Sequence, residues 1–137
     1  MADQPVVVVI DDSPTIRKIM EMTLQRMGLR VVGAASGVTG LAAVAEHQPS
    51  LIFLDIVLPN VSGYQLCQVI RRNPNTKKTP IVMLSGKDGI FDKIRGRLVG
   101  ANDYITKPFE PGSILAAVKK HVPSAVQPSL GALVSRS

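Results

Sequence analysis

Short apolar runs alternate along this chain with longer segments in which apolar residues recur at helical spacing. The apolar runs cover residues 6–10, 29–34, 51–54, 81–84 and 104–105. They are too short for buried helices, and the valine-rich first run is typical of a strand buried on both faces. Strands that alternate with helices form parallel sheets, so the pattern predicts an α/β domain of five βα units.

Capping residues mark the ends of the first predicted helix. Ser13 and Pro14 are expected to begin it and Gly28 to end it. The other helices are predicted at 39–47, after the turn at 59–63, within 87–99 and at 111–121. The apolar residues expected to face the core from the first and third helices are Ile16, Ile19, Met20, Met27, Leu66, Val69 and Ile70.

The composition fits one globular domain. The chain has 137 residues, of which 45% are apolar and 19% charged, and only 4% are aromatic. Cys67 is the single cysteine, so it cannot form an internal disulfide; we expect it to pack within a helix in a reducing, cytoplasmic setting. After Pro123 the residues turn small and polar, which predicts a domain over 1–123 and a flexible tail over 124–137.

The formal net charge of +6 raises the question of nucleic-acid binding. The basic residues are scattered over several predicted helix faces and turns without interleaved aromatic residues. This distribution favours a solvated surface, and no nucleic-acid partner is expected. No run resembles a signal peptide or approaches the roughly 20 apolar residues that span a membrane, so no membrane association is expected.

Polar side chains follow four of the five predicted strands. Asp11 and Asp12 follow the first strand, Asp55 the third, Ser85 the fourth and Lys107 the fifth. The carboxyl ends of parallel strands lie at one edge of the sheet, where ligands bind, so these side chains are predicted to meet. The second strand ends in small residues and is expected at the margin of the sheet.

Three carboxylates in one shallow pocket repel one another unless a cation lies among them. Oxygen ligands of this kind favour Mg²⁺, with Mn²⁺ as a substitute, and Mg²⁺ commonly binds together with phosphate oxygens. Lys107 could pair with one phosphoryl oxygen and the Ser85 hydroxyl could donate to another. Taken singly, each residue also fits a helix cap or a solvated charge, but their joint placement favours a phosphate site.

Four motifs carry a family resemblance. They are Val-Ile-Asp-Asp-Ser at 9–13, Leu-Asp-Ile-Val-Leu-Pro from 54 with Gly63 downstream, Met-Leu-Ser at 83–85, and Asp-Tyr-Ile-Thr-Lys-Pro-Phe at 103–109. Over residues 6–122 the chain resembles the receiver domains of response regulators, of the chemotaxis-regulator type. Residues 63–65 and 84–93 resemble stand-alone receivers of type IV pilus twitching and phototaxis systems. The resemblance implies a flavodoxin-like sheet of order 2-1-3-4-5 flanked by five helices.

The resemblance also implies a mechanism. Asp55 would accept a phosphoryl group from a histidine kinase or phosphotransfer domain, in a protein that catalyses only its own phosphorylation and dephosphorylation. Asp11, Asp12, Asp55 and the Val57 backbone carbonyl would hold Mg²⁺. Lys107 and Ser85 would contact the phosphoryl group, and the Lys107-Pro108 peptide bond is a candidate for the cis form.

A switch is implied as well. Ser85 would move toward the phosphoryl group, and Tyr104 would turn inward into the space that Ser85 leaves. The fourth helix, fifth strand and fifth helix would then present a changed surface to an effector protein. Basic residues on this surface favour an acidic partner, namely Lys93, Arg97 and Lys119.

Two positions depart from the family pattern, and three other readings stay open. Gly86 stands where the family more often has Ala, and Val57 offers no polar side chain to orient a hydrolytic water. One alternative is an aspartate-nucleophile phosphohydrolase. Such an enzyme usually needs an acidic residue two positions beyond its nucleophile; with Asp11 as the nucleophile, that position is Ser13. The others are the receiver half of a DNA-binding transcriptional regulator and a phosphate sink without an output partner.

Overall fold

The computed structural model describes residues 4–86 and 90–123 and contains one parallel sheet. The order of its strands is β2-β1-β3-β4-β5, which confirms the predicted order 2-1-3-4-5. Every neighbouring pair of strands is parallel. The strands are β1 (Val6–Ile10), β2 (Arg30–Ala34), β3 (Leu51–Asp55), β4 (Ile81–Ser85) and β5 (Asp103–Thr106). The predicted tail at 124–137 and the loop residues 87–89 lie outside the described residues.

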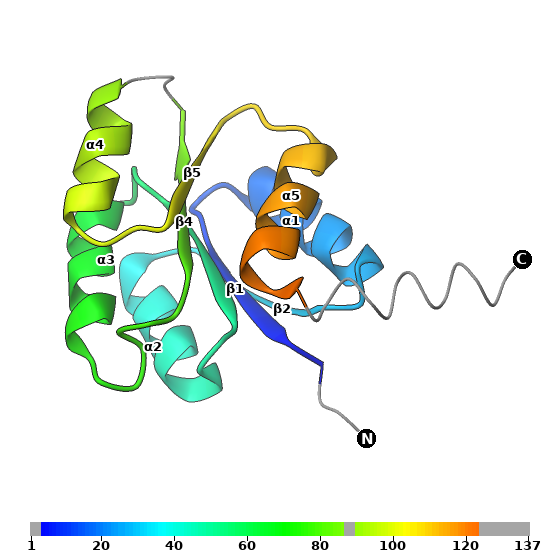
Figure 1. Cartoon of the computed structure of the whole chain (residues 1–137), viewed down its shortest axis with the longest axis horizontal. Helices are drawn as coiled ribbons and strands as arrows, with labels where there is room; N and C mark the ends of the chain where they lie inside the picture. The colour runs from blue at the N-terminus through cyan, green and yellow to red at the C-terminus, as the bar shows by residue number, and fades with distance from the viewer. Residues whose placement is uncertain (1–3, 87–89, 124–137) are drawn as a thin grey trace, which may run out of the picture.

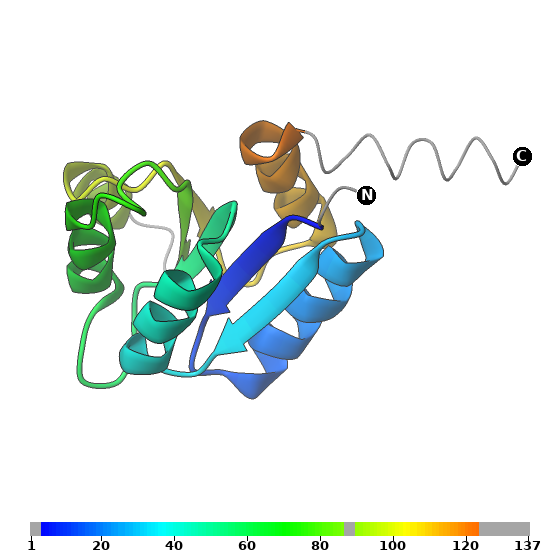
Figure 2. The same cartoon turned by 90° about the horizontal axis from the view of Figure 1, so that it is seen from below.

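Five helices cover the two faces of this sheet. They are α1 (Pro14–Arg26), α2 (Gly37–His47), α3 (Gly63–Arg72), α4 (Ile90–Leu98) and α5 (Pro111–His121). Figure 1 shows α1 and α5 together on one side of the strands and α2, α3 and α4 on the other. Figure 2 shows β1 and β2 lying side by side, with α1 and α2 on opposite faces. This is the doubly wound arrangement that the alternation of strands and helices predicts.

The core consists of two clusters, one on each face of the sheet. Alternate residues of β1 divide between them, because successive side chains of a strand point to opposite faces: Val8 and Ile10 lie in one cluster, and Val7 and Val9 in the other. Cys67 is fully buried in the first cluster, as expected of a helix-packing residue. Strands buried on both faces therefore form the centre of the molecule.

Two details of the predicted helix faces were wrong. Ile19 and Val69 were expected to face the core, but their side chains are 46% and 45% exposed. In α1 the fully buried residues are Met20 and Leu24, which are four positions apart and so lie on one face of the helix. The other residues predicted for this stripe, Ile16, Met20 and Met27, do pack in the second core cluster, and Leu24 joins them in place of Ile19 on the side of α1 that packs against α5.

The predicted helix ends are confirmed for α1. The Ser13 hydroxyl accepts a hydrogen bond from the Ile16 amide, and Pro14 is the first helical residue. Gly28 follows the helix with φ of 84°, a left-handed conformation that glycine adopts without the penalty a β-carbon brings. The Ser13 cap starts α1 directly after Asp11 and Asp12, so these two residues lie in the short link between β1 and the helix.

Candidate functional site

Three carboxylates lie together at the carboxyl ends of β1 and β3. Asp11, Asp12 and Asp55 each offer one oxygen, and these oxygens all lie within 4.8 Å of one another. Asp11 is fully buried and Asp55 is 4% exposed, whereas Asp12 is exposed. β1 and β3 are neighbours whose crossovers lead to opposite faces of the sheet, the place where ligands bind in such folds. The predicted clustering of these carboxylates is confirmed.

The two buried carboxylates are oriented in the same way. Oδ1 of Asp11 accepts a hydrogen bond from the Ser13 amide at 2.9 Å, and Oδ1 of Asp55 accepts one from the Val57 amide at 3.1 Å. In each case the donor lies two residues further along the chain, where the strand turns into a loop. Each carboxylate therefore has one oxygen fixed by backbone, and the other oxygen faces Lys107.

Lys107 places its ammonium group between these carboxylates. Its Nζ lies 2.7 Å from Oδ2 of Asp11 and 3.2 Å from Oδ2 of Asp55. The backbone amide of Lys107 donates to the Ser85 carbonyl at 2.6 Å, which ties the residue to the end of β4. The Lys107-Pro108 peptide bond is cis, as proposed from the sequence. The end of β5 thus delivers a positive charge to the ends of β1 and β3.

The electrostatics of the site follow from burial and from these charges. Burial, and then the neighbouring charge of Asp11, raise the pKa of Asp55, and the Lys107 ammonium offsets this only in part. For Lys107, burial lowers the pKa, but the carboxylates of Asp11 and Asp55 outweigh it and the net pKa is raised. The site therefore holds more negative charge than one ammonium neutralises.

The donor set fits a hard metal cation. It consists of carboxylate oxygens, the ligands that Mg²⁺, Mn²⁺ and Ca²⁺ prefer. Oδ2 of Asp11 is fully buried and makes no hydrogen bond of normal geometry within the described part of the chain, although the Lys107 ammonium faces it. A buried carboxylate oxygen without a hydrogen-bond donor is stabilised by a bound cation. Asp11, Asp12 and Asp55 could therefore hold a metal ion.

The first residue of α3 packs directly against the backbone of Asp55. A β-carbon at Gly63 would collide with the Asp55 carbonyl oxygen and would lie 2.8 Å from the α-carbon of Ile56. The Gly63 amide donates to the Ile56 carbonyl at 2.8 Å, and Ser62 caps the helix. Close backbone approach therefore explains why glycine stands at this position.

The hydroxyl of Ser85 is directed to a residue that the sequence analysis did not single out. Ser85 is buried at the end of β4, and its Oγ donates to Oδ2 of Asp92 in α4 at 2.9 Å. The other carboxylate oxygen of Asp92 accepts a hydrogen bond from the Tyr64 hydroxyl, also at 2.9 Å. Tyr64 and Asp92 both lie in the segments 63–65 and 84–93 that carry the resemblance to pilus-type receivers, but nothing in the sequence indicated that the two side chains meet.

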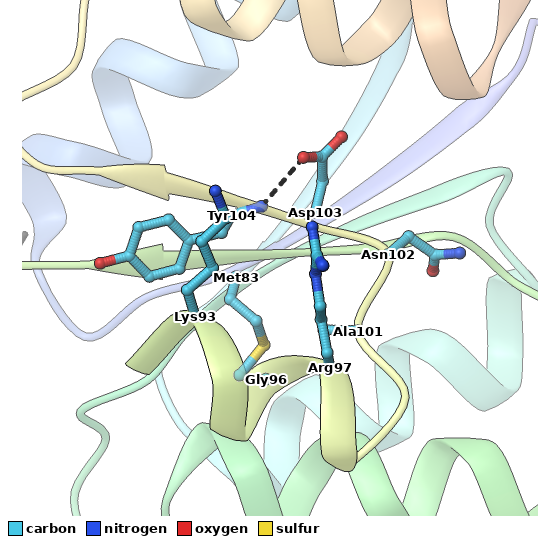
Figure 3. Close-up of a pocket in the computed structure, with 8 residues that line it drawn as sticks. All are labelled: Met83, Lys93, Gly96, Arg97, Ala101, Asn102, Asp103 and Tyr104. Atoms are coloured by element: carbon cyan, nitrogen blue, oxygen red, sulfur yellow. Dashed lines mark hydrogen bonds between the residues drawn. The ribbon is translucent and has the colours of Figure 1, made fainter. Parts of the chain in front are cut away.

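Tyr104 is partly buried on β5, beside a small pocket next to α4. Figure 3 shows Tyr104 and Asp103 from β5, Met83 from β4, and Lys93 and Arg97 from α4 around this pocket. Its volume of about 20 Å³ is room for roughly one water molecule and too little for a phenol ring. This pocket alone therefore cannot hold the Tyr104 ring.

A family model and curated relatives match this chain. The model described as the response regulator receiver domain matches residues 7–119. Protein PilG of Pseudomonas aeruginosa is 49% identical over 118 residues, which are 86% of this chain and 87% of PilG. The transcriptional regulator RpaA of Synechocystis is 41% identical over 84% of this chain, but the chain spans only about half of its length, 48%.

Solved structures agree with these relatives. Chemotaxis response regulator CheY4 of Vibrio cholerae has a TM-score of 0.83 and 31% identity, covering 88% of this chain and 100% of CheY4. In the part of the chain that the structure describes, no helix is both long and apolar enough to cross a membrane. The fold, the acidic cluster and these matches agree, and the chain belongs to the response regulator receiver domain family.

Proposed function

We propose that this response regulator is switched by phosphorylation of Asp55. The observation that carries the proposal is the position of the Lys107 ammonium, which contacts Oδ2 of both Asp11 and Asp55. A carboxylate that is buried, oriented by a backbone amide and next to a fixed cation is arranged for attack on phosphorus. The phosphoryl donor would be the phosphohistidine of a histidine kinase or a phosphotransfer domain.

In this reaction Oδ2 of Asp55 forms the bond to phosphorus while the bond between phosphorus and the histidine nitrogen breaks. The nitrogen keeps the electron pair and takes up a proton, and Asp55 becomes an acyl phosphate. Lys107 would move from the carboxylate to a phosphoryl oxygen, where its charge offsets the charge that the transferred group brings. The same groups would serve the reverse attack by water, so the domain would promote only its own phosphorylation and dephosphorylation.

We propose Mg²⁺, or Mn²⁺ in its place, as the metal of the acidic cluster. Asp11, Asp12, Asp55 and the Val57 backbone carbonyl would be its protein ligands. Bound there, the ion would neutralise charge on the equatorial phosphoryl oxygens. The buried oxygen of Asp11, which lacks a hydrogen bond of normal geometry, supports this assignment.

The output would come from the surface formed by α4, β5 and α5. Ser85 would donate to the phosphoryl group, and Tyr104 would turn toward the space beside β4. Lys93, Arg97 and Lys119 are exposed and give these elements positive charge, which favours an acidic effector protein. The likeness to PilG and to the chemotaxis regulator CheY4 supports a role in pilus motility or chemotaxis.

We propose a cytoplasmic location, with a receiver domain at 1–123 and a flexible tail at 124–137, which fits the composition. We propose no nucleic-acid partner and no membrane partner for these residues. The likeness to RpaA keeps open the alternative that this is the receiver part of a DNA-binding regulator.

Incubation with acetyl phosphate and Mg²⁺, followed by intact-mass measurement, tests the proposal. The wild type should gain one phosphoryl group, and Asp55→Asn should gain none. Asp103→Asn is the matched control, because it makes the same change on β5 at a residue that contacts Lys120 and His121 instead of the acidic cluster. Equal labelling of Asp55→Asn and wild type would exclude Asp55 as the acceptor.

The phosphohydrolase alternative is tested in the same reaction. Repeated turnover of small phosphomonoesters would favour that alternative, whereas stoichiometric labelling favours the receiver function. Ser13, at the place where such an enzyme usually has its acid, caps α1 and donates its amide to Asp11. That structural role supports the receiver function over the hydrolase.

A further inference from the structure

Asp92 joins three elements of the fold through its two carboxylate oxygens. Oδ2 accepts the hydrogen bond from the Ser85 hydroxyl at the end of β4, and Oδ1 accepts the one from the Tyr64 hydroxyl in α3. Asp92 itself lies in the first turn of α4. A carboxylate can accept at both oxygens but donates at neither, so Ser85 and Tyr64 are the donors in both bonds.

Both bonds lead back to the phosphoacceptor. Ser85 ends the strand that pairs with β3, in which Asp55 lies opposite Leu84. Tyr64 directly follows Gly63, which packs against the backbone of Asp55. Tyr64 is 5% exposed, and the guanidinium of Arg95, also in α4, lies 4.4 Å from the centre of its ring. The first turn of α4 is thus attached to both segments that flank Asp55.

The opposite end of α4 is attached to a different set of groups. Arg71 in α3 donates to the Gly100 carbonyl at 2.8 Å, just after α4, and to Oδ1 of Asn102 at 2.7 Å. It also donates to the Thr79 carbonyl at 2.7 Å. None of these groups belongs to the acidic cluster. A change at Asp55 can therefore reach the first turn of α4 while Arg71 holds the end of the helix.

The Ser85 hydroxyl has one proton to donate. While that proton is donated to Asp92, it is not available to a phosphoryl oxygen on Asp55. We propose that Asp92 is a positioning residue that retains the Ser85 hydroxyl in the unphosphorylated protein. This inference rests on the proposed function of Asp55. Phosphorylation moves the hydroxyl from Asp92 to the phosphoryl group, and the first turn of α4 is released while its other end stays bound to Arg71.

A titration with beryllofluoride, a tetrahedral mimic of the phosphoryl group, tests this competition at saturating Mg²⁺. In Asp92→Ala the concentration of beryllofluoride that gives half saturation should fall by about tenfold. This factor corresponds to the net free energy of the hydrogen bond to a charged group that Ser85 no longer has to break. The effect should vanish when Asp92→Ala is combined with Ser85→Ala. A purely structural role for Asp92 would change the affinity equally in both backgrounds, so the combination separates the two roles.

A second variant covers the case in which Asp92→Ala fails to fold, because that change leaves the buried Tyr64 hydroxyl unpaired. Asp92→Asn keeps one oxygen that can accept from the Tyr64 hydroxyl, but its other group is an NH2 that donates to the Ser85 oxygen and cannot accept the Ser85 proton. The serine proton is then free for the phosphoryl mimic, and only a neutral hydrogen bond holds the serine oxygen, so the half-saturating concentration should fall by about threefold. Amide hydrogen exchange gives an independent measurement. Beryllofluoride should speed exchange of the amides of residues 94–97 in the wild type, because these amides donate to the carbonyls of the first turn of α4. Either variant should show the faster exchange without it.

The outcomes distinguish this inference from the proposed function. If the wild type does not bind beryllofluoride, the function proposed for Asp55 fails and the role of Asp92 fails with it. If the wild type binds but the Asp92 variants bind equally or more weakly, the function stands and Asp92 does not retain Ser85. A gain in affinity that persists in the Ser85→Ala background also overturns the proposal, because the gain would then not involve the serine.

Discussion

Gly63 lies against the backbone carbonyl of Asp55, so close that no β-carbon fits between them. Gly63→Ala should therefore push α3 away from the end of β3 and lower the free energy of unfolding by about 1–3 kcal/mol, as overpacking does. Because the same contact positions Asp55, labelling by acetyl phosphate should also slow. Urea unfolding and intact-mass measurement check the two effects.

Gly112→Ala is the matched control for this change. A β-carbon at position 112 in α5 meets nothing within 4 Å. Replacing a helical glycine with alanine should then stabilise the protein by roughly 0.5–1 kcal/mol and leave labelling unchanged. Equal effects of the two substitutions on unfolding and labelling would show that the contact between Gly63 and Asp55 neither stabilises the fold nor positions Asp55.

Removal of the Lys107 ammonium should strengthen metal binding. In Lys107→Met the buried carboxylates of Asp11 and Asp55 lose their positive neighbour, so the affinity for Mg²⁺ should rise by about tenfold. In the absence of metal, Lys107→Met should lower the free energy of unfolding by about 1–3 kcal/mol, because the two buried carboxylates are left without a positive partner. Calorimetric titration with Mg²⁺ and thermal unfolding with and without the ion measure both quantities.

Lys18→Met is the control for general loss of charge, since Lys18 is exposed on α1. This variant should bind Mg²⁺ as the wild type does. Weaker binding by Lys107→Met than by Lys18→Met would mean that the ammonium supports the metal site, contrary to the expectation that the two cations compete for the same oxygens.

Asp103 should stabilise the contact between β5 and α5 in a pH-dependent way. Burial raises the pKa of Asp103, but hydrogen bonds from Lys120 and His121 outweigh it and the net pKa is lowered. A lowered pKa in the folded state gives stability that is present above the ordinary value of 3.8 and is lost as the pH falls through the folded value.

Asp103→Asn should accordingly lose roughly 0.5–1 kcal/mol at neutral pH, a small value because the pair is partly solvated. Urea unfolding of variant and wild type should give stabilities that converge as the pH falls below 3.8 and through the lowered pKa of the folded wild-type carboxyl. A constant gap across the pH range would mean that packing, and not charge, accounts for the effect.

The environment of Tyr64 should be visible in its ionisation. Burial, and then the hydrogen bond and charge of Asp92, raise the pKa of Tyr64 to about 12. Because the unfolded phenol ionises first, near its ordinary value of 10.0, stability should fall as the pH rises from there through about 12. In a Tyr104→Phe background Tyr64 is the only tyrosine, so ultraviolet absorbance follows its phenolate alone.

In the same background, Asp92→Asn should lower the pKa of Tyr64, because the negative charge that opposes the phenolate is removed. Titration of Tyr64 at its ordinary value in the protein with Asp92 intact would contradict the hydrogen bond between these two residues. This measurement needs neither metal nor phosphoryl donor, so it tests the contact separately from the function.

The sequence by itself determined the architecture and the acidic cluster. Asp11, Asp12, Asp55 and Lys107 could be assigned to one place because each follows a strand, and parallel strands bring their carboxyl ends to one edge of the sheet. Ser13 and Gly28 marked the ends of α1 because capping depends on local backbone geometry. Features set within a few residues of the chain, or by the regular order of strands, were predictable.

The tertiary structure alone decided which side chains meet across the helices. The partner of the Ser85 hydroxyl is seven residues away and that of Tyr64 is 28 residues away, so these contacts depend on how α4 packs against β4 and against α3. In α1, helical spacing allowed a stripe through Ile19 as well as one through Leu24, and the packing of α5 selected Leu24. Spacing in sequence restricts a side chain to one face of its helix, but the position of the neighbouring helix determines which face is buried.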